Sequence, residues 1–304
     1  MIQKPTVLIL GAGASNPYGY PLGGDLVNII VSLTSRSGGL AGILADDPGL
    51  DDFHTRLQGS DVESIDDFLE SNPQFSELGK VCIAAALTVW GPPVSYTLDP
   101  NKNWYRYLWG RLHEGASGSQ EFQSNRLSIV TYNYDRSLER YLTRVLVSTF
   151  PDLAQSGQPA AAAFAAQTIP IVHLHGSLGD ADDTVRLTEN RGSYITLEFF
   201  RSAAAGIRIV HEEKPSEEYA RAHDLLSAAQ SVHLLGFGYH PTNVRRLDLV
   251  KQSQRSTGWT SWGGTALGLE AAERARKEKL VALGGNVLQP VDCLAYLRTF
   301  AVLE

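Results

Sequence analysis

The chain has 304 residues, of which 43% are hydrophobic and 19% are charged, a composition typical of a globular rather than a disordered protein. Its formal net charge of -7 gives no general attraction to polyphosphate backbones, so direct nucleic-acid binding is not expected. No stretch approaches the roughly 20 apolar residues that a membrane span needs, and the N-terminal apolar run is too short for a secretory signal. We therefore expect no membrane association and a cytoplasmic location.

The sequence contains two cysteines, Cys82 and Cys293, which lie far apart. Two cysteines cannot build a disulfide framework or a four-cysteine zinc site, so neither is expected. Both are expected to be small buried residues that pack like apolar ones.

Four apolar runs that end in glycine or polar residues are typical of buried strands, and they lie at residues 6–10, 127–131, 169–174 and 231–235. Helical spacing of apolar residues separates them, at residues 22–33, 136–147 and 216–229. Buried strands that alternate with helices predict an α/β fold, with a Rossmann-like parallel sheet and helices on both faces. Ligands of such sheets bind beyond the carboxyl ends of the strands.

Residues 35–125 interrupt this alternation because they show little strand character. Three runs within them have helical spacing, at residues 61–72, 75–90 and 103–115. We interpret residues 35–125 as an all-helical insertion, a candidate lid or assembly surface, and assign residues 1–34 and 126–304 to the Rossmann-like domain. Residues 265–283 predict a further helix whose charged side chains mostly mark a solvated face.

The first predicted strand runs into a glycine-rich turn that consists of Gly11, Ala12, Gly13, Ala14 and Ser15. Glycines in such a turn permit positive φ and let a phosphate approach the backbone amides. Asn16 stands where the usual dinucleotide fingerprint has a third glycine, which weakens a hydride-transfer interpretation. A tight turn without a ligand is the alternative.

Polar residues follow the second predicted strand in the stretch "TYNYD". In an extended backbone Thr131, Asn133 and Asp135 would share one face at the ligand edge of the sheet. The alternative is structural, with Asp135 capping the helix that starts near Arg136 and Asn133 making a turn.

Two histidines, His173 and His175, end the third predicted strand in "HLHG". A metal site would need a third ligand, and no nearby residues offer recognisable zinc spacing, so no metal is expected. His173 lies within the apolar run and is expected to be a hydrogen-bonded inner residue. His175 lies at the strand end, beside Gly176, where a histidine is well placed for acid/base catalysis.

Taken in order, the motifs "GAGAS", "GYP", "TYNYD", "HLHG" and "LLGFGY" resemble those of the sirtuin superfamily. The resemblance implies that the Rossmann-like domain binds NAD and is catalytic. It implies catalytic roles for Asn133, Asp135 and His175. It also implies an NAD pocket that includes the glycine-rich turn, Pro21, Thr131, Gly176, Gly236 and Gly238. His240 and Asn243 are further candidates for this pocket, and a plain turn is the alternative for the two glycines after the fourth strand.

The sequence differs from the protein-deacylating sirtuins in ways that favour another group of the superfamily. With two cysteines, the chain cannot make their zinc module. Its motif with Asn133 and Asp135 also contains two tyrosines, Tyr132 and Tyr134. Together with the helical segment, these departures look like the bacterial sirtuin-like effectors that hydrolyse NAD in antiphage defence. The resemblance thus implies an NAD glycohydrolase that releases nicotinamide and ADP-ribose, with NAD as its substrate, no other cofactor and no zinc.

The same resemblance implies a gated enzyme, because a cell could not tolerate constant NAD destruction. A homo-oligomer and an ATPase or other partner protein of the defence system are the expected partners. Two alternatives stay open: a non-catalytic module that senses NAD or ADP-ribose, and a sirtuin-type protein deacylase or ADP-ribosyltransferase.

Overall fold

A computed structural model describes residues 1–89, 100–179, 196–209, 216–238, 240–249, 261–262, 292–299, 301 and 303. Their fold is α/β, with a Rossmann-like parallel sheet flanked by helices, as predicted. The charged helix predicted at residues 265–283 lies outside the described residues.

The described residues form a five-stranded sheet with strands β1 (Thr6–Leu10), β2 (Leu127–Thr131), β3 (Ile171–His173), β4 (Ser231–Leu235) and β5 (Ser261–Trp262). Their order is β3-β2-β1-β4-β5, and every pairing is parallel. The first four strands confirm the predicted runs. Strand β3 is shorter than predicted at both ends. Ile169 is the C-cap of the preceding helix, where its N–H donates to the Ala165 carbonyl, and after the strand the Gly176 N–H donates to the His173 carbonyl at 3.3 Å. Strand β5 was not predicted, since two residues are too short to give an apolar run.

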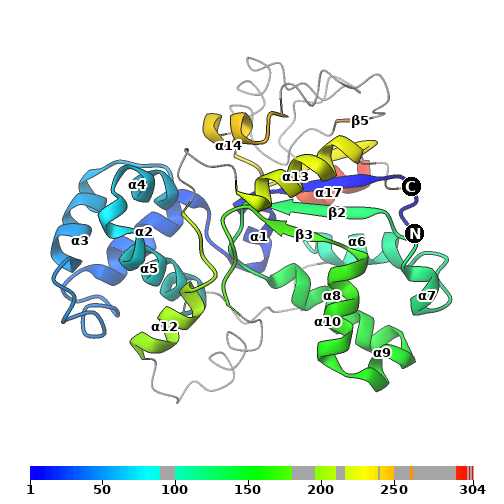
Figure 1. The fold of residues 1–304 in the computed structure, drawn as a ribbon, viewed down its shortest axis with the longest axis horizontal. Coiled ribbons are helices and arrows are strands. Elements are labelled where there is room, and N and C mark those ends of the chain that lie inside the picture. Colours follow the sequence, from blue (N-terminus) through cyan, green and yellow to red (C-terminus); the bar gives the residue numbers. More distant parts are fainter. Residues whose placement is uncertain are drawn as a thin grey trace.

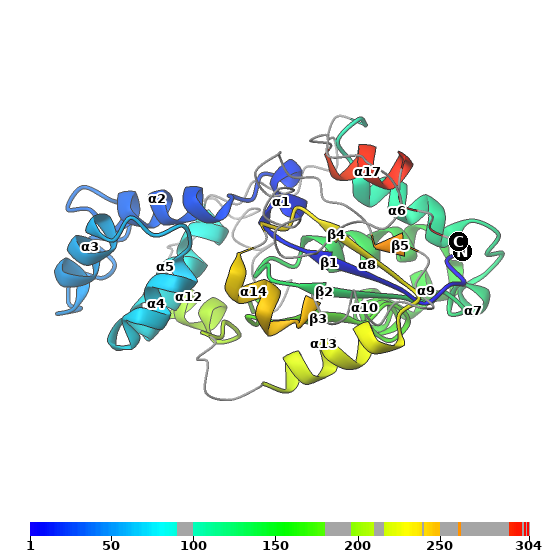
Figure 2. The same cartoon turned by 90° about the horizontal axis from the view of Figure 1, so that it is seen from above.

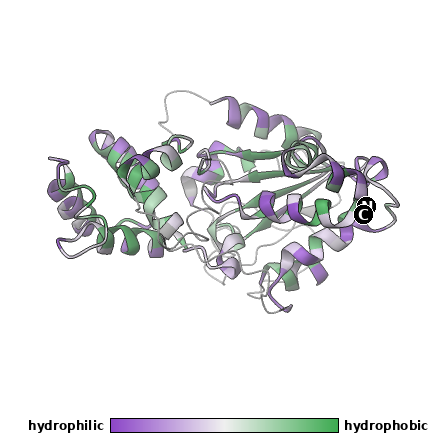
Figure 3. Cartoon of the chain, turned by 90° about the horizontal axis from the view of Figure 1, so that it is seen from below, coloured by the Kyte–Doolittle hydropathy of each residue, from purple (hydrophilic) through white to green (hydrophobic). Residues whose placement is uncertain are grey.

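Helices cover both faces of the sheet (Figure 2). One face packs against α13 (Glu217–Ala228) and α14 (Pro241–Arg246), and the other against α6 (Trp104–His113), α8 (Ser137–Thr149) and α17 (Cys293–Thr299). Because strand side chains alternate, Val7 and Ile9 of β1 join the apolar cluster with α13, whereas Leu8 and Leu10 join the cluster with α8. Figure 3 shows the strands as hydrophobic, which is expected when both faces are buried.

A group of helices lies beside the sheet in Figure 1, and we call it the helical lobe. It consists of α2 (Gly23–Thr34), α3 (Leu50–Gly59), α4 (Ile65–Ser71), α5 (Ser76–Val89) and α12 (Leu197–Ala204). Helix α5 packs against α2, α4 and α12, and α2 packs against α3. The rings of Phe53, Phe68 and Phe75 pack together in its core, with centroids 5.5 to 6.1 Å apart.

The remaining described helices are α1 (Ala12–Ser15), η1 (Asn16–Tyr18), η2 (Pro73–Phe75), α7 (Ser119–Phe122), α9 (Pro151–Ser156) and α10 (Gln158–Thr168). Helix α10 packs against α8 and α9, at the end of the molecule away from the helical lobe (Figure 1).

The helices predicted within residues 35–125 divide between two places. Helices α3 to α5 join the helical lobe together with α2 and α12, which come from outside that range. Helix α6 lies against the sheet, where Trp104 Nε1 donates to the Ala14 carbonyl at 2.8 Å and the Tyr105 hydroxyl hydrogen-bonds Ser137 Oγ at 2.7 Å. The described parts of residues 35–125 contain no strand, as predicted, while the domain boundaries at residues 34 and 125 stay a prediction.

The described residues include both cysteines and the helices named above. Cys82 and Cys293 are both free and buried, as predicted. No helix in the described part of the chain has the length and apolar character needed to pass through a membrane.

The turns after β1 and β4 pack with their backbones in close contact. The Gly11 N–H donates to the Leu235 carbonyl, and the Gly13 N–H donates to the Gly236 carbonyl, each at 3.0 Å. Gly236 has a φ of 57°, and a Cβ added there would lie 2.0 Å from the Ala14 nitrogen. The packing of these two turns therefore requires glycine irrespective of any ligand.

Gly236→Ala is expected to lower the free energy of unfolding by about 1–3 kcal/mol, because it adds left-handed strain and a clash with backbone. Thermal unfolding followed by circular dichroism measures this. Gly238→Ala is the matched control, since its added Cβ meets nothing within 4 Å and should change stability by less than about 0.5 kcal/mol. Equal melting temperatures for the two variants would contradict the packing argument.

Candidate active site

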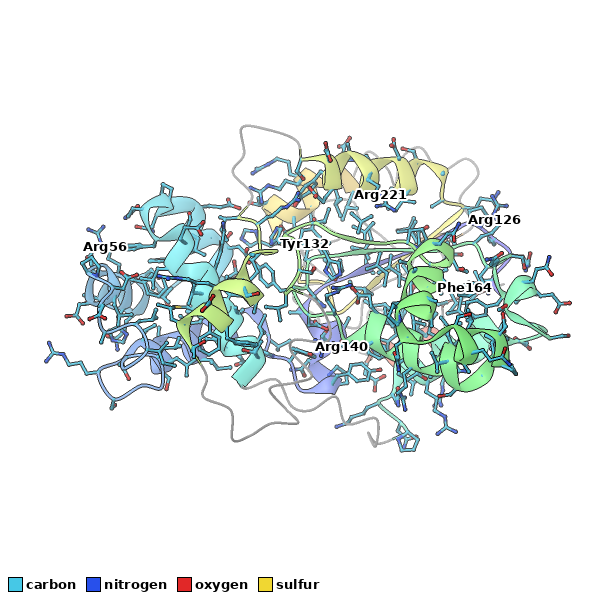
Figure 4. The ribbon with its side chains drawn as sticks, turned by 60° about the horizontal axis from the view of Figure 1, so that its bottom comes forward. Arg56, Arg126, Tyr132, Arg140, Phe164 and Arg221 are labelled. Atoms are coloured by element: carbon cyan, nitrogen blue, oxygen red, sulfur yellow. The ribbon has the colours of Figure 1, made fainter. Side chains whose placement is uncertain are left out.

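A pocket of about 470 Å³ opens at the carboxyl ends of β1, β2 and β4. The strand order reverses at β1, which makes this edge the place where ligands bind in open α/β sheets. Its volume lies within the range of small-molecule sites, about 300–1,000 Å³. Its walls come from the turns after these strands and from α4 of the helical lobe. Figure 4 shows Tyr132, one of the lining residues, between the lobe and the sheet.

Most residues predicted from the motifs line this pocket, namely Gly11, Ala12, Gly13, Ser15, Pro21, Asn133, Asp135, His175, Gly236, Gly238, His240 and Asn243. Segments far apart in the sequence therefore meet at one edge of the sheet. That these residues bind NAD stays a prediction.

Three predicted residues do not line the pocket: Ala14, Thr131 and Gly176. Ala14 is buried and its carbonyl accepts the Trp104 indole N–H, and Thr131 Oγ1 accepts the Asn133 N–H at 3.0 Å. Gly176 pairs with Ile207 in an isolated bridge, where an added Cβ would lie 2.0 Å from the Gly206 carbonyl oxygen. These three residues hold the backbone that forms the pocket.

The segment after β2 is not the extended strand that the alternation suggested. The strand ends at Thr131, and the four residues that follow, Tyr132 to Asp135, all line the pocket. The Asn133 N–H donates to the Thr131 hydroxyl at 3.0 Å rather than to a neighbouring strand. The two tyrosines thus belong to the pocket wall together with the predicted polar residues.

The side chain of Asn133 is fixed by hydrogen bonds that settle its orientation. Its Nδ2 donates to the Gly11 carbonyl and to Ser15 Oγ, each at 3.0 Å. A carbonyl can only accept, so the nitrogen must face Gly11. Both N–H groups of the amide are thereby used, and the Asn133 oxygen is left as the acceptor on this half-buried side chain.

Asp135 is buried, and its contacts are with neighbouring protein groups. Its carboxylate accepts the N–H and the hydroxyl of Ser137, the first residue of α8, and the hydroxyl of Ser15. Burial raises the pKa of Asp135 above its usual value, although the bonds from Ser137 and Ser15 oppose the rise. The predicted alternative was that Asp135 caps this helix, but the N-cap residue of α8 is Arg136, and Asp135 accepts the Ser137 N–H from the position before it. Asp135 is linked to Asn133 through the Ser15 hydroxyl, which donates to the Asp135 carboxylate and accepts from Asn133 Nδ2.

His173 is a hydrogen-bonded inner residue, as predicted. Its Nδ1 contacts the Asn133 carbonyl oxygen and its Nε2 contacts Glu139 Oε1, each at 2.8 Å. Both partners can only accept, so both ring nitrogens carry protons. Burial alone would lower the pKa of His173, but the charge and hydrogen bond of Glu139 raise it above its usual value. His173 thus fixes the backbone of Asn133 from outside the pocket.

Glu139→Gln should destabilise the protein most in mildly acidic solution. Burial would raise the pKa of Glu139, but the charge of His173 lowers it, so its contribution is lost as the pH falls through that lowered value. The contribution of His173 is complete below its unfolded value of 6.5 and is lost as the pH rises through its raised pKa. The pair therefore stabilises most between pH 4.5 and 6.5, the usual values of the two groups.

Urea unfolding of Glu139→Gln measures this effect. We expect the substitution to lower the free energy of unfolding by about 1–3 kcal/mol near pH 5.5 and by less near pH 9. A loss that grows steadily with pH would contradict the assignment of charged partners.

His175 is buried, with an exposed fraction of 5%, and it lines the pocket. Its Nδ1 lies 3.1 Å from Oδ1 of Asp66, and its Nε2 is buried and has no hydrogen-bond partner among the described residues. The Tyr132 ring packs edge-on against the imidazole, with centroids 5.4 Å apart. Asp66 and Tyr132 thus hold the ring, and Nε2 is its unpartnered nitrogen among the described residues.

The contribution of α4 was missed by sequence reasoning. Asp66, Asp67 and Glu70 of this helix line the pocket, opposite the predicted motifs. The available signal was the acidic spacing in "IDDFLE", which places three carboxylates on one side of a helix. That spacing predicts a polar helix face, but it does not indicate which part of the protein the face meets.

The described residues contain no group of three or more histidine, cysteine, aspartate or glutamate side chains that could hold a metal ion. The expectation that the protein binds no metal stays a prediction.

A parallel α/β sheet with a pocket at the reversal of its strand order defines a Rossmann-like protein with a small-molecule site. Residues 127–279, just over half of the chain, match the family described as the SIR2-like domain. The chain therefore belongs to the SIR2-like domain family, within the sirtuin-like superfamily, and this membership indicates an NAD-dependent enzyme. No curated protein matched the chain in a comparison of sequences.

Proposed function

We propose that this protein is an NAD glycohydrolase that cleaves NAD to nicotinamide and ADP-ribose. The observation that carries the proposal is that Asn133 and His175, 42 positions apart in the sequence, line one pocket at the ligand edge of the sheet. Family membership supplies NAD as the substrate class. The wall from α4 faces the motif residues across the pocket, and such a wall limits the access of bulk water to a bound substrate.

Cleavage of NAD needs little acid assistance to nicotinamide, the leaving group. The bond between ribose C1′ and the nicotinamide nitrogen breaks, and nicotinamide departs with the electron pair, which neutralises its ring. Positive charge then develops on the ribose, so the transition state resembles an oxocarbenium ion. The enzyme gains most by orienting the ribose and by placing acceptor groups near the developing charge.

Two side chains fit these needs. The Asn133 oxygen, whose amide nitrogen is fully engaged, is an acceptor for a ribose hydroxyl or for water near C1′. Nε2 of His175 is a base that can take the proton of the attacking water, or of a ribose hydroxyl. Water adds its oxygen to C1′, and its proton passes to His175 and then to solvent. Asp135 supports Asn133 through Ser15.

The experiment is to incubate the purified chain with NAD and to follow nicotinamide and ADP-ribose by chromatography. Equal amounts of the two products support hydrolysis. Binding of NAD without nicotinamide release would instead favour the sensing module. Nicotinamide release only in the presence of an acyl-lysine peptide or a protein acceptor would favour a deacylase or an ADP-ribosyltransferase.

The biological role that we propose is NAD depletion in antiphage defence, under the control of a gate. This part of the proposal rests on the resemblance to sirtuin-like defence effectors. Homo-oligomers and a partner ATPase of the same system are the proposed means of control. Nicotinamide release by the chain alone, compared with release in the presence of its genomic neighbour, tests the gate.

A further inference from the structure

The helical lobe contributes a carboxylate that contacts the imidazole of His175 in the pocket wall. Asp66 lies in the first turn of α4, and its Oδ1 is 3.1 Å from Nδ1 of His175. The start of α4 is fixed because Ser64 Oγ accepts the Asp67 N–H at 3.2 Å. Asp66 is more than 100 positions before His175 in the sequence, and its helix belongs to a different packing unit.

Burial makes this contact stronger than an ion pair on the surface. The side chains of His175 and Asp66 are only 6% and 19% exposed. Burial alone would raise the pKa of Asp66, but the charge and hydrogen bond of His175, with a further bond from Tyr134, lower it below its usual value. Asp66 is therefore a carboxylate at neutral pH, and a carboxylate can only accept.

Tyr134 fixes the carboxylate from the other side. Its hydroxyl donates to the same oxygen of Asp66 that contacts His175. Burial and the nearby carboxylate of Asp66 raise the pKa of Tyr134 well above its usual value, so the hydroxyl keeps its proton and stays a donor. The Asp66 oxygen thus has two donors, one from the segment after β2 and one from His175.

We propose that Asp66 is a positioning residue for His175: it accepts the Nδ1 proton, fixes one tautomer of the imidazole and leaves the buried Nε2 unprotonated. This inference rests on the proposed function, in which Nε2 takes a proton during NAD cleavage. The partner of Nδ1 is what decides the tautomer of a neutral histidine. An imidazole that carried its proton on Nε2 could not act as the base.

Other contacts of α4 show that Asp66 is held in place by its helix. Asp67 Oδ2 lies 3.5 Å from His240 Nε2, and Glu70 Oε1 lies 2.9 Å from Arg246 Nη1. Both partners come from the region of α14, on the sheet side of the pocket. The same helix thus supplies the carboxylate that contacts His175 and makes the ion pairs with the region of α14.

The test compares Asp66→Asn with Asp52→Asn, a matched change in the same lobe. Asp52 pairs on the surface of α3 with Arg56, which lies at the far end of the lobe from the pocket (Figure 4). The tautomer is read from long-range ¹H–¹⁵N NMR spectra, in which the His175 signals are identified by their loss in His175→Gln. Steady-state NAD cleavage is measured on the same proteins.

We expect the wild type and Asp52→Asn to carry the proton on Nδ1 of His175. An asparagine can turn its NH₂ toward Nδ1, so Asp66→Asn should shift the proton to Nε2. It should also lower kcat for NAD cleavage about 100-fold, with KM changed less than about threefold, within the range of general-base assistance. Tyr134→Phe, which removes one donor to Asp66 and keeps the ring, should lower kcat by a smaller factor.

An unchanged His175 tautomer in Asp66→Asn, or an unchanged kcat, would overturn the positioning role. Should Asp66→Asn fail to fold, an unchanged kcat in Tyr134→Phe would overturn it. A wild type that binds NAD and releases no nicotinamide would contradict the proposed function instead. In that case the NMR comparison alone decides whether Asp66 orients His175.

Discussion

His175→Ala is expected to lower the rate of nicotinamide release from NAD by about 100- to 10,000-fold, the range that general-base assistance supplies. The substitution removes the only ring nitrogen in the pocket wall that is buried without a hydrogen-bond partner among the described residues. It leaves Asn133 and its bonds to Gly11 and Ser15 in place, so NAD binding should be reduced far less than turnover. Initial rates of nicotinamide release at several NAD concentrations separate the two effects.

His113→Ala is the matched control for this experiment. His113 is the last residue of α6, where its ring stacks on Trp109 with centroids 5.4 Å apart, and it does not line the pocket. Its removal should leave NAD cleavage within about twofold of the wild type, a change of under 0.5 kcal/mol. Circular dichroism spectra and melting temperatures establish that both variants are folded. An NAD cleavage rate in folded His175→Ala equal to that of the wild type would remove His175 from the mechanism.

The strands could be predicted because burial on both faces leaves a strong local signal. Each of the four predicted runs consists of apolar residues with a glycine or polar end, as parallel strands covered by helices require. The place of the pocket followed from the same reasoning, because the motifs stand at the carboxyl ends of the strands. Strand β5, Ser261–Trp262, gave no such signal, since two residues carry no periodicity.

The side-chain partners inside the pocket could not be predicted, because they depend on contacts between distant segments. Alternation along a strand suggested that Thr131, Asn133 and Asp135 act together, yet the strand ends at Thr131 and the link between Asn133 and Asp135 passes through Ser15. Asp66 lies in a helix whose own spacing reports only that one face is polar. Its meeting with His175 is set by how the helical lobe packs beside the sheet.

Asn133→Ala should abolish most NAD cleavage, by about 100-fold or more, while NAD binding is partly retained. The Asn133 oxygen is the acceptor that we propose near ribose C1′, and removal of one preorganised polar group costs about 100- to 1,000-fold in comparable sites. The glycine-rich turn does not depend on this side chain for its shape, because its bonds to Leu235 and Gly236 are made by backbone atoms. Calorimetric titration with NAD and nicotinamide release measure binding and turnover on the same protein.

Ser15→Ala tests whether NAD cleavage depends on how the side-chain amide of Asn133 is oriented. This change removes one of the two acceptors for Asn133 Nδ2 and the hydroxyl bond to Asp135, but it leaves the bond to the Gly11 carbonyl. The amide should then be less well fixed, and turnover should fall about tenfold, which corresponds to the roughly 1.4 kcal/mol of one modest hydrogen bond. Unfolding of Asn133→Ala, rather than loss of turnover in a folded protein, would favour the alternative in which Asn133 makes the turn.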